Sequence, residues 1–284
     1  MSTSEADMLK YFSTLIEKET GIQYSEVNGH LLLNRLNDLA KFVGLENAAA
    51  LWLDVRKNGL TPVAKAHALD LATNNETSFF RDVEIFDFFK TQFVPKTMNS
   101  SAGIRIWCAA TSTGQEPYGL AMTMAELRLA GIHKNYQILA TDISDRVLKQ
   151  AASGTYSQLE VQRGLPATML VKYFDQVNDA ASNFPRYRIK SELSAHISFK
   201  LRNLLEPWPN GEVFDIVFCR NVLIYQNVEN KKAVIARIAA VLAPGGYLVL
   251  GGAESLLGLS DSFEMEQYGR ACVYRAKQSI RASA

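Results

Sequence analysis

From about residue 103 onward the sequence alternates short apolar runs with helical stretches, and this alternation constrains the fold more than any other feature. Strands that are joined by crossover helices pair in parallel, and a parallel sheet needs cover on both faces. We therefore predict an α/β domain in the second part of the chain. The predicted strands are 104–108, 136–140, 214–219 and 247–250, and the predicted helices are 117–129, 145–152 and 231–242, the last one ended by a stop at 243–246.

Residues 1–74 have helical periodicity only. Apolar side chains recur every three or four residues around Phe12, Leu36 and Leu51, and Thr61-Pro62 begins a fourth helix with proline in its first turn. We predict an all-α N-terminal domain at 1–74, followed by the α/β domain at 75–284.

Residues 155–200 interrupt the alternation of strands and helices. This stretch is more polar, and 178–185 has the composition of a loop. Residues 187–190 and 197–201 alternate between apolar and polar side chains in the manner of half-buried strands. We predict a small antiparallel insertion at about 155–200.

Composition excludes several classes of protein. The 284 residues are 48% hydrophobic, which is typical of a globular chain and not of a disordered one. Thirty basic and 29 acidic residues give a net charge of +1, so nothing favours nucleic acid or an anionic membrane as the main partner. No apolar run approaches the ~20 residues of a membrane span, and the polar start lacks a secretory signal. We expect a cytoplasmic protein with no membrane insertion.

The cysteines and histidines give little support to a metal site. Cys108, Cys219 and Cys272 are far apart and lie in apolar runs, so we predict buried, reduced thiols. The sequence contains no CxxC and no HExxH motif, and we predict no metal.

Ligands of open α/β sheets bind beyond the carboxyl ends of the strands, so the residues that follow the predicted strands are candidates. The small-residue turn at 109–116 is either a plain tight turn or a loop that a ligand approaches, and it lacks both the GxGxxG and the GxxxxGK[ST] patterns. Asp142 follows the second strand, where a carboxylate can accept hydrogen bonds from ribose hydroxyls. Its alternative role is a helix cap, for which Ser144 competes.

Further polar side chains are predicted at the same edge. Glu116 has two possible roles: its carboxylate either only stabilises the N-terminus of its helix electrostatically, or pairs with the ammonium group of a ligand. Arg220 and Asn221 follow the strand at 214–219, with Tyr225 nearby, and they form either a ligand contact or a satisfied turn. Arg81 follows two phenylalanines, and its planar fork suits a carboxylate. A nucleoside site without phosphate-binding features points to S-adenosylmethionine rather than NAD or ATP.

Together these segments resemble the motifs of CheR, the chemotaxis receptor glutamate methyltransferase family. The resemblance runs in order from about residue 8 to 275. It is carried by Asn75-x-Thr77-x-Phe79-Phe80-Arg81, Ser112-Thr113-Gly114-x-Glu116-Pro117-Tyr118, Thr141-Asp142-Ile143 and Phe218-Cys219-Arg220-Asn221-Val222-x-Ile224-Tyr225. It implies a helical N-terminal domain followed by a Rossmann-like methyltransferase domain with a small β-subdomain.

The resemblance also implies a reaction, in which S-adenosylmethionine methylates the γ-carboxylate of glutamates on the cytoplasmic helices of a chemoreceptor and leaves S-adenosylhomocysteine. Arg81 and Tyr225 match the family positions nearest the transferred methyl group. The family's cofactor contacts carry over to Asn75, Thr77, Arg81, Glu116, Asp142, Asn203, Leu204, Arg220 and Asn221.

Two features bear on the partners. Some family members hold a peptide from the receptor's C-terminus on the β-subdomain, at a position matched by Arg188, but the loop at 175–186 lacks the glycines of those members, so we expect recognition without the tail. Residues 1–74 carry seven basic and nine acidic side chains, a net charge of −2, so a strongly basic docking helix is not evident. We expect a monomer.

Alternative functions remain open at this stage. One is a methyltransferase that acts on another protein carboxylate or on a small molecule, because the fold alone allows it. Another is a non-catalytic receptor-binding module that binds S-adenosylhomocysteine. An NAD-dependent dehydrogenase is disfavoured, because the turn at Gly114 lacks the dinucleotide fingerprint.

Overall fold

The computed structural model describes residues 3–24, 29–99, 101–178, 184–209 and 211–277. It divides into two compact units. The first takes in Met1–Asn74 and Tyr225–Lys231, and the second takes in Asn75–Ile224 and Lys232–Ala284. Within the residues that the structure describes, no helix combines the length and apolar character needed to cross a membrane.

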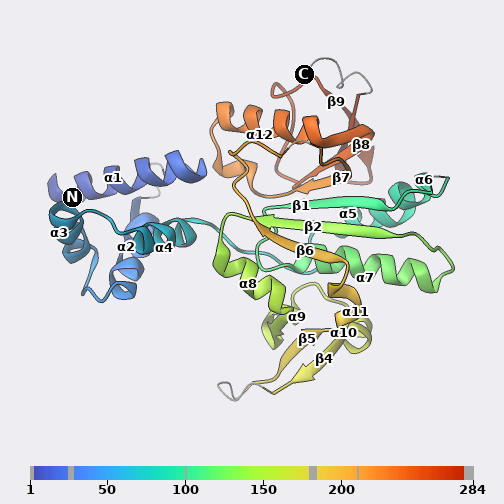
Figure 1. Ribbon diagram of the computed structural model, residues 1–284, viewed down its shortest axis with the longest axis horizontal. Helices are drawn as coiled ribbons and strands as arrows, with labels where there is room; N and C mark the ends of the chain where they lie inside the picture. The colour runs from blue at the N-terminus through green and yellow to red at the C-terminus, as the bar shows by residue number, and fades with distance from the viewer. Residues whose placement is uncertain (1–2, 25–28, 100, 179–183, 210, 278–284) are drawn as a thin grey trace. The chain divides into compact units, whose positions relative to one another are not determined.

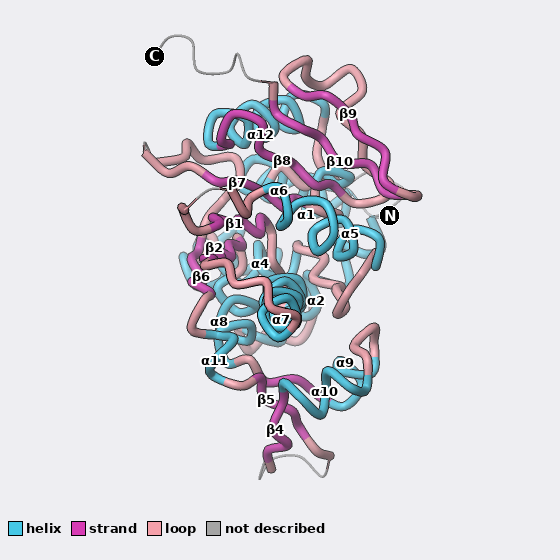
Figure 2. Tube along the Cα trace, turned by 90° about the vertical axis from the view of Figure 1, so that its right-hand side faces the viewer, coloured by secondary structure: helices cyan, strands magenta, loops and turns pink. Residues whose placement is uncertain are grey.

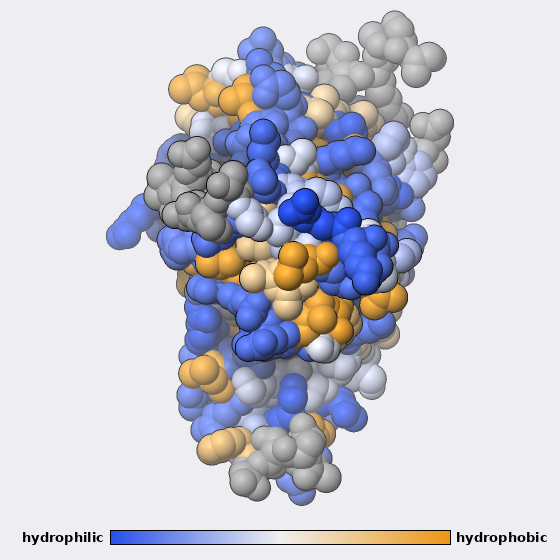
Figure 3. Space-filling model, turned by 90° about the vertical axis from the view of Figure 1, so that its left-hand side faces the viewer, coloured by the Kyte–Doolittle hydropathy of each residue, from blue (hydrophilic) through white to orange (hydrophobic). Residues whose placement is uncertain are grey.

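In the described part of the first unit, four complete helices pack around one apolar core. The predicted stripes form that core, and Phe12, Leu39 and Leu51 are almost completely buried. The fourth helix begins at Pro62, as predicted, and Thr61 caps it by accepting a hydrogen bond from the Ala64 amide. The helices are α1 (Thr3–Thr20), α2 (Gly29–Phe42), α3 (Ala48–Asn58) and α4 (Pro62–Ala72). Figure 3 shows hydrophobic residues among hydrophilic ones on the surface of this unit.

The segment 225–231 belongs with these helices and not with the second domain, where the sequence analysis placed it. A β-bridge joins Ile22 to Gln226, and the Gln23 amide donates to the Tyr225 carbonyl at 3.1 Å. Gly21 lies beside this bridge and has a φ of +75°, a conformation that favours glycine. Contacts between residues some 200 positions apart leave no periodic signal in the sequence.

The second unit contains a seven-stranded sheet in the order β6-β2-β1-β7-β8-β10-β9. The first five strands are parallel, and β10 and β9 are antiparallel additions. The chain passes from β1 to β2 on one side and later to β7 on the other side, which creates a topological switch point at β1. The strands are β1 (Ile104–Ala109), β2 (Tyr136–Asp142), β6 (Ile197–Leu201), β7 (Phe214–Cys219), β8 (Leu242–Leu250), β9 (Phe263–Tyr268) and β10 (Ala271–Ala276).

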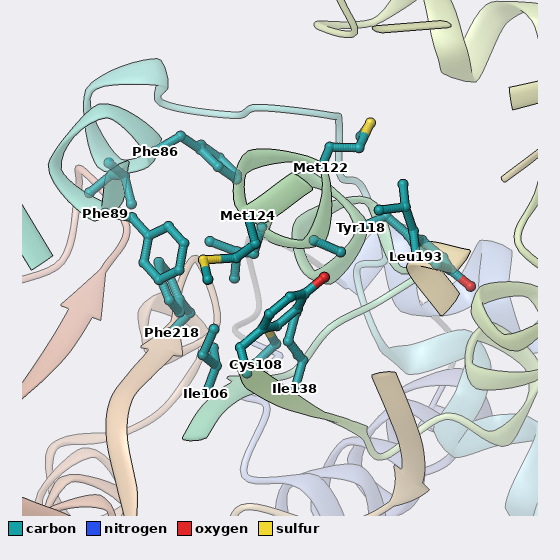
Figure 4. Close-up of a cluster of buried hydrophobic side chains, with 14 of the residues drawn as sticks. Phe86, Phe89, Ile106, Cys108, Tyr118, Met122, Met124, Ile138, Leu193 and Phe218 are labelled. Carbon is teal, nitrogen blue, oxygen red and sulfur yellow. The ribbon is translucent and has the colours of Figure 1, made fainter. Parts of the chain in front are cut away.

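Helices cover both faces of this sheet, as the parallel pairing requires. Figures 1 and 2 show α12 on one side and α5 and α7 on the other. Figure 4 shows the larger core, where Phe86, Phe89 and Met124 of the helical layer meet Ile106 and Phe218 of the sheet. The helices of this unit outside its insertion are α5 (Val83–Phe88), the π-helix η2 (Phe89–Phe93), α6 (Val94–Lys96), α7 (Gln115–Leu129), α8 (Asp145–Ser153), the 3₁₀ helix η3 (Leu223–Tyr225), which ends in the first unit, and α12 (Val228–Val241), which begins there.

The predicted insertion is present, but one of its strands was assigned wrongly. A three-stranded antiparallel sheet has the order β3-β5-β4. By contrast, residues 197–201 form β6, which pairs in parallel with β2 at the edge of the main sheet. An edge strand of a parallel sheet is half exposed, so its side chains alternate as they do in an antiparallel hairpin. The elements of the insertion are β3 (Thr155–Ser157), α9 (Gln158–Gln162), α10 (Ala167–Tyr173), β4 (Phe174–Val177), β5 (Arg186–Ile189) and α11 (Ser191–Ser194), and residues 179–183 of the predicted loop lie outside the described residues.

The predicted stop at 243–246 is part of β8. Leu242 pairs with Phe214 and Tyr247 pairs with Ile216, so four residues of β8 stand opposite the single residue Asp215. This wide bulge accommodates Pro244, which cannot donate to a strand ladder.

A tight contact with the insertion fixes the backbone of the motif at 75–81. The Phe79 amide donates to the Arg163 carbonyl at 3.2 Å. Gly164 has a φ of +85°, and a Cβ there would lie 2.0 Å from the Phe79 carbonyl oxygen. Backbone packing therefore requires glycine at this position.

We expect Gly164→Ala to destabilise the protein more than Gly131→Ala does. Both glycines have the same backbone conformation, with φ of +85° and +86°, so both substitutions carry the cost of about 1–2 kcal/mol for an L-residue in the left-handed region. Only Gly164 adds a backbone clash, since a Cβ at Gly131 meets nothing within 4 Å. Urea unfolding measures the difference, and equal losses would contradict the packing of the 75–81 segment against Gly164.

Candidate active site

Backbone strain is concentrated at the predicted motifs. Among the described residues, five that are not glycine have positive φ, and all five lie in or beside a motif. Such conformations cost about 1–3 kcal/mol each and persist where the surroundings enforce them, often at functional sites. These residues are Phe80, Asp82, Ala110, Ser112 and Asn221.

The loop after β1 is fixed to two neighbouring segments. The Ser112 amide donates to Asp142 Oδ2 at 2.8 Å, and the Ser112 hydroxyl donates to the Asn75 carbonyl at 2.8 Å. Gly114 begins α7, and a Cβ on it would lie 2.9 Å from the Cβ of Ala151. The loop thus runs close to α8 and brings the segment that begins at Asn75 to the end of β2.

Asp142 organises the end of β2 and does not cap the following helix. Its Oδ1 accepts from the Ser144 amide at 3.0 Å, and its side chain is almost fully buried. Ser144 is the N-cap of α8, through a hydrogen bond from the Val147 amide to its hydroxyl. This arrangement removes the capping alternative for Asp142.

Asn203 and Leu204 follow β6 and lie beside the same edge. The Arg202 amide donates to the Asp142 carbonyl at 2.8 Å, which ties this loop to the end of β2. Asn203 Oδ1 accepts from the Leu205 amide at 2.9 Å and forms a local turn, and Leu204 packs partly buried against the core on the α12 side of the sheet.

Arg220 joins three parts of the site. Its Nη1 lies 2.7 Å from Glu116 Oε2, and its Nη2 lies 2.6 Å from Asp82 Oδ2 and 2.7 Å from the Arg81 carbonyl oxygen. The side chain of Arg220 is only 4% exposed. One buried guanidinium therefore connects the end of β7, the first turn of α7 and the turn that follows Arg81.

The charge of Arg220 is maintained by its partners. Burial alone lowers the pKa of this guanidinium, but the carboxylates of Glu116 and Asp82 outweigh that effect and raise it above its ordinary value. Breaking a buried ion pair by removing one partner costs about 3–5 kcal/mol, because the other charge stays uncompensated. The pair with Asp82, whose side chain is 46% exposed, contributes less than the pair with Glu116.

Glu254 supports the loop that follows Arg220, and the sequence analysis missed it. Its two carboxylate oxygens accept five backbone amides, at distances of 2.7–3.2 Å. The donors are the amides of Asn221, Val222, Leu223, Ile224 and Gly251. The sequence did contain a signal for Glu254, which lies four residues after β8. Because β8 is the parallel neighbour of β7, an acidic residue there would reach the same edge of the sheet.

Arg81 and its surroundings are more exposed. Arg81 Nη1 is 3.5 Å from the Glu76 carbonyl, and the Glu76 carboxylate pairs with Arg163 at 2.8 Å. Thr77 is half-buried in the same segment. Asp82, the neighbour of Arg81, is a second residue that sequence reasoning missed, because its role depends on a partner 138 positions away.

Tyr225 falls in the first unit, whereas Arg81 belongs to the second. Its hydroxyl oxygen accepts from Asn74 Nδ2 at 2.8 Å. The structure therefore gathers Asn75, Glu116, Asp142, Arg220 and Asn221 at the carboxyl ends of the strands, and it groups Tyr225 with the helical unit.

The thiols near this edge are structural. Cys108 and Cys219 are fully buried, and burial raises the pKa of both thiols well above its ordinary value. Cys272 is half-buried and also reduced. No group of three or more His, Cys, Asp or Glu that could hold a metal ion occurs in the part of the chain that the structure covers.

Comparison with known proteins decides the family. The domain described as "CheR methyltransferase, SAM binding domain" matches residues 75–272. The chain is 36% identical to chemotaxis protein methyltransferase 1 of Pseudomonas aeruginosa, over 98% of this chain and 100% of that protein. It is also 36% identical to the chemotaxis protein methyltransferase of Vibrio parahaemolyticus, over 94% and 95%. The chain belongs to the CheR methyltransferase family.

Solved methyltransferases are similar only at a distance. A TehB-like SAM-dependent methyltransferase from Corynebacterium glutamicum gives a TM-score of 0.39 at 12% identity, over 66% of this chain and 86% of that chain. The N-methyltransferase NodS from Bradyrhizobium japonicum gives 0.37 at 15% identity, over 69% and 99%. The family match itself confirms the predicted resemblance and the predicted cofactor, S-adenosylmethionine, and it leaves a dinucleotide-dependent dehydrogenase without support.

The residues at the sheet edge fit that cofactor chemically. Its ribose hydroxyls need acceptors and its ammonium group needs a carboxylate, and the side chains of Asp142 and Glu116 are carboxylates that lie at the switch point. Two buried polar atoms there, Thr111 Oγ1 and Arg220 Nε, have no hydrogen-bond partner among the described residues. Buried polar atoms normally have hydrogen-bond partners, so the absence of partners for these two atoms is consistent with a polar ligand at this edge.

We expect Glu254→Gln to unfold at lower urea concentration, with a loss of about 2–3 kcal/mol. A glutamine keeps one acceptor oxygen, but its amide group would face backbone donors that now point at a carboxylate. Glu264→Gln is the control, because that carboxylate is 52% exposed and pairs with a solvent-exposed arginine, Arg275, so the pair contributes little to stability. Equal effects of the two substitutions would contradict the supporting role of Glu254.

Proposed function

We propose that this chain transfers the methyl group of S-adenosylmethionine to the γ-carboxylate of specific glutamates on the cytoplasmic helices of chemoreceptors. The observation that carries the proposal is the convergence of strained motif segments at the switch point, where Arg220 joins Glu116 to the turn after Arg81. The names of the full-length relatives, which are chemotaxis protein methyltransferases, support the substrate class.

The cofactor supplies an electrophilic methyl group on a sulfonium, and the remaining tasks belong to the protein. Asp142 accepts hydrogen bonds from the ribose hydroxyls, and Glu116 pairs with the ammonium group while Arg220 holds its carboxylate in place. We assign further cofactor contacts by the match to the family motifs, and these are Asn75, Thr77, Arg81, Asn203, Leu204, Arg220 and Asn221.

The nucleophile needs no general base. A glutamate side chain has an unperturbed pKa of ~4.3, so it is already an anion near neutral pH. The protein must therefore align the carboxylate with the methyl group and exclude water, an effect that can supply ~7–11 kcal/mol in favourable cases. A site rich in positioning contacts suits that task.

Arg81 and Tyr225 are the proposed catalytic residues. Arg81 attracts a carboxylate, either that of the cofactor's methionine group or that of the substrate, and its exposure leaves it accessible to an incoming helix. The Tyr225 hydroxyl donates a hydrogen bond to the substrate oxygen and aims it.

The proposed activity has consequences for the partners of the protein. We place the protein in the cytoplasm as a monomer that meets receptor helices directly, without nucleic acid and without insertion into the membrane. Arg188 lies on β5, the central strand of the small sheet, so a receptor tail that adds as a strand would have to pair with β3 or β4 instead. We propose recognition that does not depend on such a tail.

We expect Arg81→Ala to reduce kcat/KM at least about a hundredfold, within the range for losing a group that stabilises the reacting charge. Arg128→Ala is the matched control, because Arg128 is exposed in the last turn of α7 and should leave turnover unchanged. Steady-state methylation of receptor fragments measures both. If Arg81→Ala weakened only cofactor affinity while kcat survived, a catalytic role for Arg81 would be wrong.

The proposed activity is tested with labelled S-adenosylmethionine and membranes rich in chemoreceptors, followed by mild alkali. A carboxyl methyl ester releases methanol in base, whereas an N-methyl group stays on the protein. We expect base-labile label on a receptor-sized band. Label that resists base would overturn the proposal and favour a methyltransferase with another kind of substrate. No label with any of the organism's receptors, while cofactor binding is intact, would overturn it and favour a binding module.

A further inference from the structure

Tyr225 is held by the helical N-terminal unit through contacts that the family motifs do not include. Its carbonyl accepts from the Gln23 amide at 3.1 Å, and the neighbouring Gln226 side chain donates to the Thr20 carbonyl at 3.2 Å. Gly21, in the same connection, has a φ of +75°, a conformation that favours glycine. The backbone of Tyr225 is therefore fixed by the connection that follows α1.

The hydroxyl of Tyr225 has its own partner in the same unit. Asn74 Nδ2 donates to the Tyr225 hydroxyl oxygen at 2.8 Å. A phenol carries one proton, and when its oxygen accepts a hydrogen bond that proton is directed to a different group. Chains of hydrogen bonds also polarise one another, so a tyrosine that accepts from an amide is a stronger donor.

Asn74 is in turn positioned by α2. Arg35 Nη1 and the Tyr24 hydroxyl both donate to the carbonyl of Ala72, the last residue of α4, at 2.5 and 2.9 Å. The Arg35 guanidinium also lies 5.4 Å from the centre of the Tyr24 ring. The half-buried side chain of Arg35 thus anchors the segment that carries Asn74, at a point two residues before it.

Arg35 lies close enough to Tyr225 for the two to interact electrostatically. Burial lowers the pKa of Arg35, and the interaction with Tyr225 opposes that shift. Arg35 is half-buried, and its guanidinium is engaged by the end of α4. Lys41 on the same helix, by contrast, is exposed and paired with Asp38.

We propose that Asn74 is a positioning residue for methyl transfer, which fixes the Tyr225 hydroxyl as a hydrogen-bond donor toward the substrate carboxylate. This inference rests on the proposed function, in which Tyr225 contacts the substrate. The amide of Asn74 and the contacts that hold it both belong to the helical unit.

The test is a double-mutant cycle on kcat with Asn74→Ala and Tyr225→Phe. Asn74→Ala should lower kcat about tenfold, since misplacement of a catalytic group has effects of this size, and leave the dissociation constant of S-adenosylhomocysteine unchanged. In the Tyr225→Phe background the same substitution should have no further effect on kcat, because the hydroxyl it acts on is gone. Asn58→Ala, on the exposed side of α3, is the control and should leave kcat unchanged.

Asn74→Asp tests the direction of the hydrogen bond. An aspartate of the same shape has no N–H to donate and would accept the Tyr225 proton, so it should lower kcat more than Asn74→Ala does. Thermal unfolding of each variant separates a loss of folding from a loss of positioning.

The outcomes distinguish this inference from the function on which it rests. If Tyr225→Phe leaves kcat unchanged, the proposed role of Tyr225 fails, and this inference fails with it. If Tyr225→Phe lowers kcat but Asn74→Ala does not, the proposed function stands and the role of Asn74 is overturned. The same conclusion follows if Asn74→Ala lowers kcat equally in the wild-type and Tyr225→Phe backgrounds. An Asn74→Asp variant that is as active as the wild type would also overturn it.

Discussion

The candidate site depends on one buried guanidinium. Arg220 stands at the end of β7 and binds Glu116 of α7, Asp82 and the Arg81 carbonyl. The Arg220 side chain is only 4% exposed, and its charge is tolerated because two carboxylates compensate it. Those carboxylates come from segments more than a hundred residues away in sequence. The same contacts that keep the charge stable therefore assemble the site.

Carboxylates hold the neighbouring loops in a similar way. Asp142 accepts two backbone amides at the end of β2, and Glu254 accepts five beside β7. These interactions offset the cost of positive φ at Ser112 and Asn221, which the loops adopt to turn sharply at the sheet edge. The result is a rigid set of segments around the switch point, which suits a reaction that needs alignment more than acid or base chemistry.

Local patterns were enough to predict the fold, but not every strand of it. Apolar runs separated by helices identified the parallel strands at β1, β2, β7 and β8, because such strands are buried on both faces. Strand β6 was misplaced because an edge strand alternates like a hairpin. The grouping of 225–231 with the helical unit was missed because Ile22 and Gln226 meet only in three dimensions.

The candidate site was predicted only where a motif or a strand end marked a residue. Asp142, Glu116 and Arg220 were found because each follows a strand or begins a helix at the expected edge. Asp82, Glu254 and Asn74 were not, because their roles consist of hydrogen bonds to distant partners, which no spacing encodes.

The central claim is that Arg220 holds in place the turn that follows Arg81, and amide hydrogen exchange of the protein without ligand tests it most directly. With Arg220→Met, the account predicts faster exchange in peptides that cover residues 75–86, while β1 at the centre of the sheet keeps its protection. Unchanged exchange at 75–86 in the folded variant would contradict the account, because the turn would then be held by something other than the arginine.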